Sequence, residues 1–165
     1  MMMGYEVKAR TMAAECTCLR ARKAARSLTK VYDDLLRPLA IEISQLGVLA
    51  ALAHFGEDGA QIGNLADALG MDRTTLTRNL GPLEKASLIR VARAPTDART
   101  RIVLLTRAGE RAIEEAFPLW QAAQQRVHDS FGKGRAESIR SDLSDLVARL
   151  RVEPAKKPSR HRVRK

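Results

Sequence analysis

Arginine and threonine side chains cluster between residues 73 and 101, and both residue types can bind nucleic acid. Arginine can donate two hydrogen bonds to a guanine base, and threonine can contact a thymine methyl group or a phosphate. Residues 73–107 contain eight Lys and Arg but only two acidic residues, Glu84 and Asp97. This excess of positive charge favours a nucleic-acid interface over an evenly charged solvent face.

A helix from residue 72 to about residue 87 would present part of this cluster. Asp72 suits the N-cap, and Leu76, Leu80 and Leu83 recur at helical spacing on one face. Pro82 removes a helical hydrogen bond and would confine base contacts to the residues before it. In the alternative interpretation the two arginines touch only phosphates or solvent. The predicted contacts, all off the apolar face, are Arg73, Thr74, Thr75, Thr77 and Arg78.

A basic β-hairpin would present the rest of the cluster. Residues 88–92 and 100–105 are strand-like, and residues 94–99 join them. Arg99 lies at the predicted tip, although the Pro95-Thr96-Asp97 sequence also suits an ordinary solvated turn. The remaining hairpin arginines are predicted phosphate contacts, which set affinity without reading sequence. They are Arg90, Arg93 and Arg101.

The order of the other predicted elements completes a winged helix-turn-helix within a mainly α fold with a small β-hairpin wing. This module would occupy residues 44–105, with Ser44 as the N-cap of its first helix, 44–55, and a short helix over 63–69. A helix over 14–37 would end at Pro38. Thr106 would cap a long helix to about residue 131, and a final helix would span 135–151.

The terminal helices, 14–37 and 106–151, carry apolar stripes that a small module cannot cover. The final helix has the clearest one: Ile139, Leu143, Leu146, Val147 and Leu150. Packing against a second copy would bury these stripes, so a symmetric homodimer is predicted within a regulator domain of residues 14–152. Residues 1–13 and 153–165 are predicted to be flexible tails, the second one basic.

These segments resemble the MarR family of bacterial transcriptional regulators. The resemblance covers about residues 14–151 and implies an obligate dimer that binds a pseudo-palindrome in double-stranded DNA, mostly as a repressor. It also implies that Arg99 enters the minor groove, with Asp97 holding it or a neighbouring arginine, and that a ligand or redox input lies near the dimer helices. The matching segments are Leu65-Ala-Asp-Ala-Leu-Gly70, Asp72-Arg-Thr-Thr-Leu-Thr-Arg78, Leu83-Glu-Lys-Ala-Ser-Leu88, and Asp97-Ala-Arg99 followed by Val103-Leu-Leu-Thr106 and Gly109.

A redox input is one possibility that the cysteines raise. Cys18, 14 residues before Tyr32, resembles the peroxide-sensing cysteine of the OhrR branch of the family, although Arg22 stands where that branch has a second tyrosine. Nearby arginines would favour a thiolate, whereas the alternative is a small buried helix residue. On one continuous helix, Cys16 and Cys18 would point about 200° apart, so a disulfide between them would require unwinding.

A small-molecule pocket is the rival input. It would lie between the first, second and long helices and be lined by Tyr32, His54, Phe117 and Trp120. Two of these aromatic residues are one helical turn apart, and aromatic pairs at that spacing are more often part of a core. The sequence leaves the pocket and the redox input as alternatives.

Composition narrows the remaining function classes. The 165 residues carry a formal net charge of +10, and 45% are apolar, which suits a folded domain with a polyanionic partner. No apolar run approaches the roughly 20 residues of a membrane span and no secretory signal is present, so a cytoplasmic location is predicted. A nonspecific architectural DNA-binding protein is the main alternative.

Enzyme and metal-binding classes find little support in the sequence. It contains no phosphate-binding loop, no Gly-x-Ser-x-Gly segment and no paired carboxylates arranged as a catalytic site, so neither an enzyme nor a cofactor is predicted. His54, His128 and His161 are too scattered to match a zinc-binding spacing.

Overall fold

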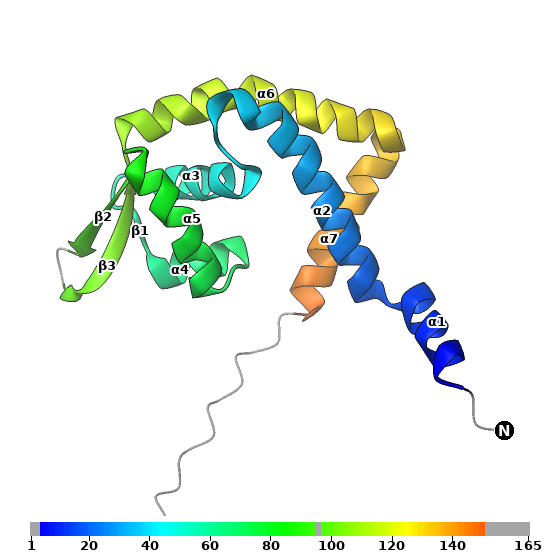
Figure 1. Ribbon diagram of the computed structural model, residues 1–165. Coiled ribbons are helices and arrows are strands. Elements are labelled where there is room, and N and C mark those ends of the chain that lie inside the picture. The colour runs from blue at the N-terminus through cyan, green and yellow to red at the C-terminus, as the bar shows by residue number, and fades with distance from the viewer. Residues whose placement is uncertain (1–3, 95–96, 151–165) are drawn as a thin grey trace, which may run out of the picture. The chain divides into compact units, whose positions relative to one another are not determined.

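The computed structural model describes residues 4–94 and 97–150 (Figure 1). The chain divides into two compact units between Gln125 and Arg126. The predicted basic tail, 153–165, lies outside the described residues. Among these residues no single helix is long and apolar enough to cross a membrane. The segments Thr17–Leu39 and Ile43–Phe55 meet the length and composition of a membrane span only when they are taken together, and the chain bends by 78° between them.

The N-terminal region differs from the prediction of a flexible tail followed by one helix over 14–37. Helix α1 spans Tyr5–Glu15, and helix α2 spans Thr17–Leu36. The chain leaves the helical conformation at Cys16 (φ −69°, ψ 105°), and the Arg20 guanidinium donates to the Ala14 carbonyl oxygen at 2.7 Å. Helix α1 contains no Gly or Pro and is rich in helix-forming residues, but it buries none of them, so no apolar stripe indicated it.

A short connection joins helix α2 to the helix that precedes the helix-turn-helix. A 3-10 turn, η1 (Arg37–Leu39), contains Pro38, and helix α3 spans Ile43–Phe55. The prediction of Ser44 as N-cap was wrong. Glu42 occupies that position in a capping box with Gln45, which satisfies backbone N–H groups from both directions.

Helices α4 (Ile62–Leu69) and α5 (Arg73–Lys85) form the helix-turn-helix. Gly70 adopts φ +61° at the turn, a left-handed conformation that glycine tolerates without a steric penalty. Helix α5 follows the predicted pattern, because Asp72 caps it and its leucines are buried. The largest fully buried side chains of the core are Leu36, Val48, Leu49, Leu52, Leu65, Leu76, Leu83 and Val103.

Three antiparallel strands form the wing, in the order β1-β3-β2. They are β1 (Ala60–Gln61), β2 (Ile89–Ala94) and β3 (Asp97–Leu105). Strand β1 was not predicted, because two residues cannot show the alternation that identifies a strand. Its pairing of Ala60 with Val103 joins the start of helix α4 to the wing (Figure 1).

Two C-terminal helices follow the wing: α6 (Arg107–Phe131) and α7 (Lys133–Leu150). The Thr106 hydroxyl accepts from the Gly109 N–H at 3.1 Å and donates to the Ser87 carbonyl oxygen at 2.7 Å, so this threonine caps helix α6 and ties it to the wing. Gly132 has φ +79° between the two helices, whereas Gly134 lies inside helix α7 and does not break it.

Candidate nucleic-acid interface

The first turns of helix α5 form one exposed polar surface. The Asp72 carboxylate accepts from the Thr75 N–H at 2.8 Å and from the Thr75 hydroxyl at 2.7 Å. These hydrogen bonds favour the ionised form and hold the pKa of Asp72 below its ordinary value. The side chains of Arg73, Thr74 and Arg78 are exposed and donate no hydrogen bond to another described residue. Their donors are therefore available to an external partner.

Arg93 and Arg101 of the wing form a basic surface beside helix α5, whereas Arg90 lines a different cleft of the wing. Arg90, Arg93 and Arg101 are all exposed, and Arg93 lies directly opposite Arg101 on the paired strands. Like charges in opposed positions repel one another, and an anion between them would relieve that repulsion. Arg99 is also exposed. The side chain of Asp97 and residues 95–96, and with them the predicted Asp97–arginine contact, lie outside the described residues.

A cleft of about 390 Å³ separates helix α5 from the wing. Thr77 and Gly81 line the helix side, and Arg93 and Arg101 line the wing side. Glu84 crosses the cleft, because its Oε1 accepts from the Val91 N–H at 3.3 Å. No sequence pattern indicates this link, since the strand register that brings the two residues together is a tertiary feature. It joins helix α5 to strand β2 of the wing.

Comparison with known proteins shows which protein family has this arrangement. A family model described as the MarR family matches residues 41–100. The structure of the transcriptional regulator MosR from M. tuberculosis is 34% identical, with a TM-score of 0.71 over 82% of this chain and 95% of that chain. This chain belongs to the MarR family. It is a DNA-binding transcriptional regulator with a winged-helix fold.

Two further MarR-family structures have been solved with DNA. MosR in complex with DNA is 35% identical to this chain, with a TM-score of 0.69 over 84% of this chain and all of that one. A mutant of E. coli MarR complexed with operator DNA has a TM-score of 0.73 at 20% identity, over 83% of this chain and 97% of that chain. The relatives compared are transcriptional regulators and not enzymes.

The two cysteines lie where helices α1 and α2 meet. Cys16 is half-buried at the break, Cys18 is exposed on the first turn of helix α2, and both are free thiols. The prediction that both sit on one continuous helix was wrong, because Cys16 lies outside helices α1 and α2. Tyr32 lies 14 residues further along helix α2, which is about 21 Å, and its hydroxyl donates to Gln124 Oε1.

The aromatic residues of the predicted pocket occupy different surroundings. Phe117 and Trp120 stack with ring centroids 5.8 Å apart, and Phe117 is 52% exposed. His54 is exposed in the last turn of helix α3, and Tyr32 is half-buried against helix α6. Among the described residues, no group of three or more His, Cys, Asp or Glu side chains could hold a metal ion.

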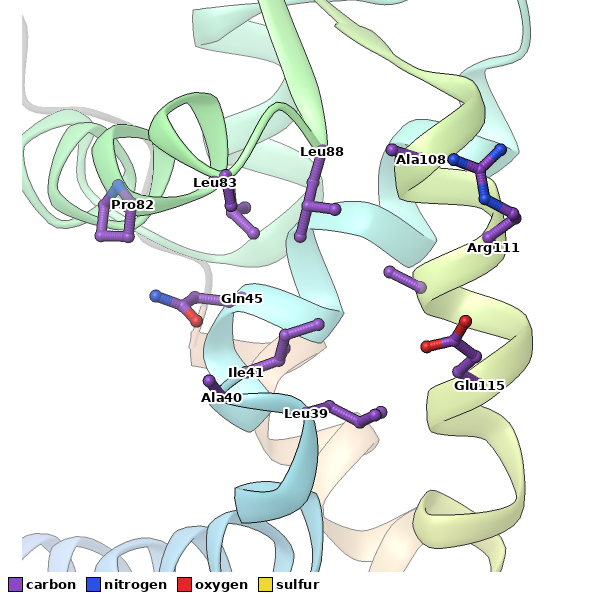
Figure 2. A pocket seen from close by; sticks show the side chains of 12 residues that line it. Leu39, Ala40, Ile41, Gln45, Pro82, Leu83, Leu88, Ala108, Arg111 and Glu115 are labelled. Atoms are coloured by element: carbon purple, nitrogen blue, oxygen red, sulfur yellow. The ribbon is translucent and has the colours of Figure 1, made fainter.

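A cavity of about 320 Å³ lies in the first unit between the end of helix α5, the α2–α3 connection and helix α6 (Figure 2). Its walls are mostly apolar, and Arg111 and Glu115 of helix α6 border it. Neither side chain forms a hydrogen bond or ion pair with another described residue. The lining residues are Leu39, Ala40, Ile41, Gln45, Pro82, Leu83, Ala86, Leu88, Ala108, Arg111, Ala112 and Glu115.

Proposed function

We propose that this MarR-family regulator represses transcription as a cytoplasmic homodimer that binds a pseudo-palindromic operator. Each winged helix-turn-helix, residues 44–105, would bind one half-site. The observation that carries this proposal is the exposed polar surface of helix α5 beside the basic surface of the wing: Thr77 of the helix and Arg93 and Arg101 of the wing line one cleft. Two such modules about 34 Å apart would enter successive major grooves on one face of DNA.

Within each half-site, the two surfaces would have different roles. The first two turns of helix α5, with Arg73, Thr74, Thr75, Thr77 and Arg78, would enter the major groove. Arg99 would insert into the minor groove, where a narrow A·T-rich groove attracts arginine. Arg90, Arg93 and Arg101 would contact the phosphates between the grooves, and Asp97 would orient an arginine at the wing tip. The opposed pair Arg93 and Arg101 lines the cleft over which that backbone would pass.

The homodimer is inferred from an apolar surface on helix α7. Leu143, Leu146, Val147 and Leu150 are between 39% and 65% exposed and recur at helical spacing. A continuous apolar stripe of this kind on a soluble protein marks an interaction surface. A second copy of helix α7 is the occupant that twofold symmetry supplies, because an isologous contact uses the same surface twice.

Release from DNA would follow occupation of the cavity in Figure 2 by a small effector. An apolar body would suit the leucine, isoleucine and proline walls, and a polar end would meet Arg111 or Glu115. The cavity contacts both the end of the recognition helix and helix α6. A ligand that fits only one arrangement of these elements would shift the population between DNA-binding and released states.

Oxidation at the α1–α2 junction is the second input that we propose, in place of or beside a ligand. Cys18 is exposed and Cys16 is two residues away in a non-helical conformation. Hydrogen peroxide would transfer one oxygen to the Cys18 thiolate, which with a proton from solvent gives a sulfenic acid and one water. A nearby thiol would then displace the sulfenic oxygen as a second water and form a disulfide. Tyr32 of the same chain is too far along helix α2 to assist this step directly.

The deciding experiment measures binding of DNA from upstream of the protein's own gene, with random DNA as competitor. One titration in reductant and a second after peroxide treatment would give the preference for upstream over random DNA and show whether oxidation changes it. Selective binding at physiological salt supports the regulator. Equal, strongly salt-dependent binding to any DNA would contradict it and favour the architectural alternative. Peroxide release that persists in Cys18→Ser and Cys16→Ser would contradict the redox input.

A further inference from the structure

A polar contact ties the middle of the recognition helix to the start of helix α3. The Ser44 hydroxyl donates to Asn79 Oδ1 at 2.9 Å, and both side chains are half-buried. Asn79 is flanked in the sequence by exposed Arg78 and buried Leu80. The contact therefore lies at the border between the apolar face of helix α5 and its exposed polar surface.

The amide of Asn79 also reaches back along its own helix. Its Nδ2 donates to the Thr75 carbonyl oxygen at 3.2 Å and lies 3.9 Å from Met71 Sδ. Thr75 is in turn bound through its N–H and hydroxyl to the Asp72 cap. A continuous set of hydrogen bonds thus runs from Ser44 to the first turn of helix α5, where the predicted base contacts lie.

At the Ser44 end, the hydrogen bonds continue to helix α2. Asp33 Oδ1 accepts from the Ile43 N–H at 2.8 Å, at the first residue of helix α3. Ser44 is the next residue, so helix α2 holds the turn that carries its hydroxyl. The position of Ser44 is consequently set from two sides, by the capping box at Glu42 and by Asp33.

Hydrophobic contacts alone would not fix the rotation of helix α5. Leu76, Leu80 and Leu83 bury apolar surface, but this driving force is non-directional and tolerates small rotations about the helix axis. A hydrogen bond depends on both distance and angle, so a half-buried one selects a single rotation. Rotating the helix would move Arg78 relative to the base edges while leaving its charge near the phosphates.

We propose that Ser44, acting through Asn79, is a positioning residue that sets the rotation of helix α5 and with it the preference for operator over random DNA. This inference rests on the proposed function, in which helix α5 reads the operator. Ser44 contacts no base itself. Its loss should therefore reduce selectivity more than overall DNA affinity.

The test compares Ser44→Ala with Ser44→Thr, which keeps the hydroxyl, and with Asn79→Ala and the double variant. Ser44→Ala should reduce operator affinity by about threefold to tenfold, and the net energy of one hydrogen bond sets the upper value. Random-DNA affinity should change by less than about twofold, because phosphate contacts are unaffected. Ser44→Thr should retain the parental preference. The double variant should lose no more than the single variant with the larger loss, because both substitutions remove the same contact.

Several outcomes would overturn the inference. These are equal losses for operator and random DNA, a Ser44→Thr variant no better than Ser44→Ala, or losses that add in the double variant. Thermal unfolding of each variant shows that the folded protein is being compared, and Ser44→Thr with Asn79→Ala keeps the test decisive if Ser44→Ala does not fold. A parent protein without operator preference would instead refute the proposed function.

Discussion

The proposed function gives different roles to arginines at different positions. Arg78 lies on the exposed surface of helix α5, whereas Arg101 lines the cleft below the wing, opposite Arg93. A side chain that binds a base edge contributes to discrimination, and one that binds a phosphate contributes to affinity for any sequence. The two kinds of arginine should therefore respond differently to removal.

Arg78→Ala should weaken operator binding by roughly five- to hundredfold and relax the preference at one position of each half-site, which is the usual range for a bidentate base contact. Arg101→Ala should weaken all sequences alike and lower the slope of log affinity against log salt by about one per site. Fluorescence-anisotropy titrations over a salt series with operator and random duplexes measure both. A uniform loss in Arg78→Ala would assign that residue to a phosphate.

The Asp72 cap predicts a pH dependence of stability. Hydrogen bonds hold the pKa of Asp72 below the ordinary 3.8, so the ionised cap stabilises the folded state above that pH. This stabilisation disappears as the pH falls through the lower pKa of the folded state. Asp72→Asn keeps a good N-cap without the titratable group. The parent should exceed Asp72→Asn in unfolding free energy at about pH 6, and the difference should shrink toward about pH 3.

Urea unfolding at several pH values measures this difference. A constant gap between the parent and Asp72→Asn across the whole range would mean that folding does not lower the pKa of Asp72.

Among the elements, helix α6 depends on a close backbone approach at its first turn. A Cβ atom at Gly109 would lie 2.2 Å from the Leu88 carbonyl oxygen and 2.6 Å from Leu105 Cδ1. Gly109→Ala must therefore push helix α6 away from the wing and should cost about 1–3 kcal/mol of unfolding free energy. Gly47→Ala, in helix α3 with nothing within 4 Å of its Cβ position, should instead stabilise by about 0.5–1 kcal/mol.

Chemical denaturation of both variants gives these free energies directly. Similar effects at the two glycines would show that helix propensity, and not the approach of helix α6 to Leu88, determines the outcome. The pair of variants thus separates a packing effect from a backbone-entropy effect.

The elements also show where sequence patterns suffice and where they fail. Helix α5 was predictable because a capping residue, a buried leucine face and an exposed polar face all agree. The break at Cys16 was not, because neither glycine nor proline marks it, and the cap at Glu42 depends on a tertiary arrangement that also brings Asp33 to Ile43. The basic residues of the site were visible from composition, whereas Glu84–Val91 and Ser44–Asn79 join positions that only the folded chain brings together.

For the whole molecule, the apolar stripe of helix α7 predicts an obligate assembly. Leu146→Glu would place a charge in that stripe, and a charge is costly to bury without a partner. The variant should sediment as a monomer and lose about 100-fold or more in operator affinity, because one half-site would be bound without the gain from linkage to the second. Ser141→Glu, at an exposed position away from the stripe on the same helix, is the control and should remain dimeric.

Analytical ultracentrifugation and operator titrations with the same samples test this directly. A Leu146→Glu protein that stays dimeric would exclude helix α7 as the principal contact. Loss of assembly in both variants would indicate general damage to the helix and not a specific interface.

The two-residue strand β1 has a consequence for how this regulator can be switched. It joins the start of helix α4 to strand β3, and Glu84 joins helix α5 to strand β2, so hydrogen bonds connect the parts that we propose recognise one half-site. An inducing stimulus would then alter the spacing that the dimer tolerates between half-sites while leaving the preferred bases within each one unchanged. DNA libraries that vary spacer length and half-site bases separately would test this. The stimulus should change the preferred spacer length and leave the preferred bases of each half-site unchanged.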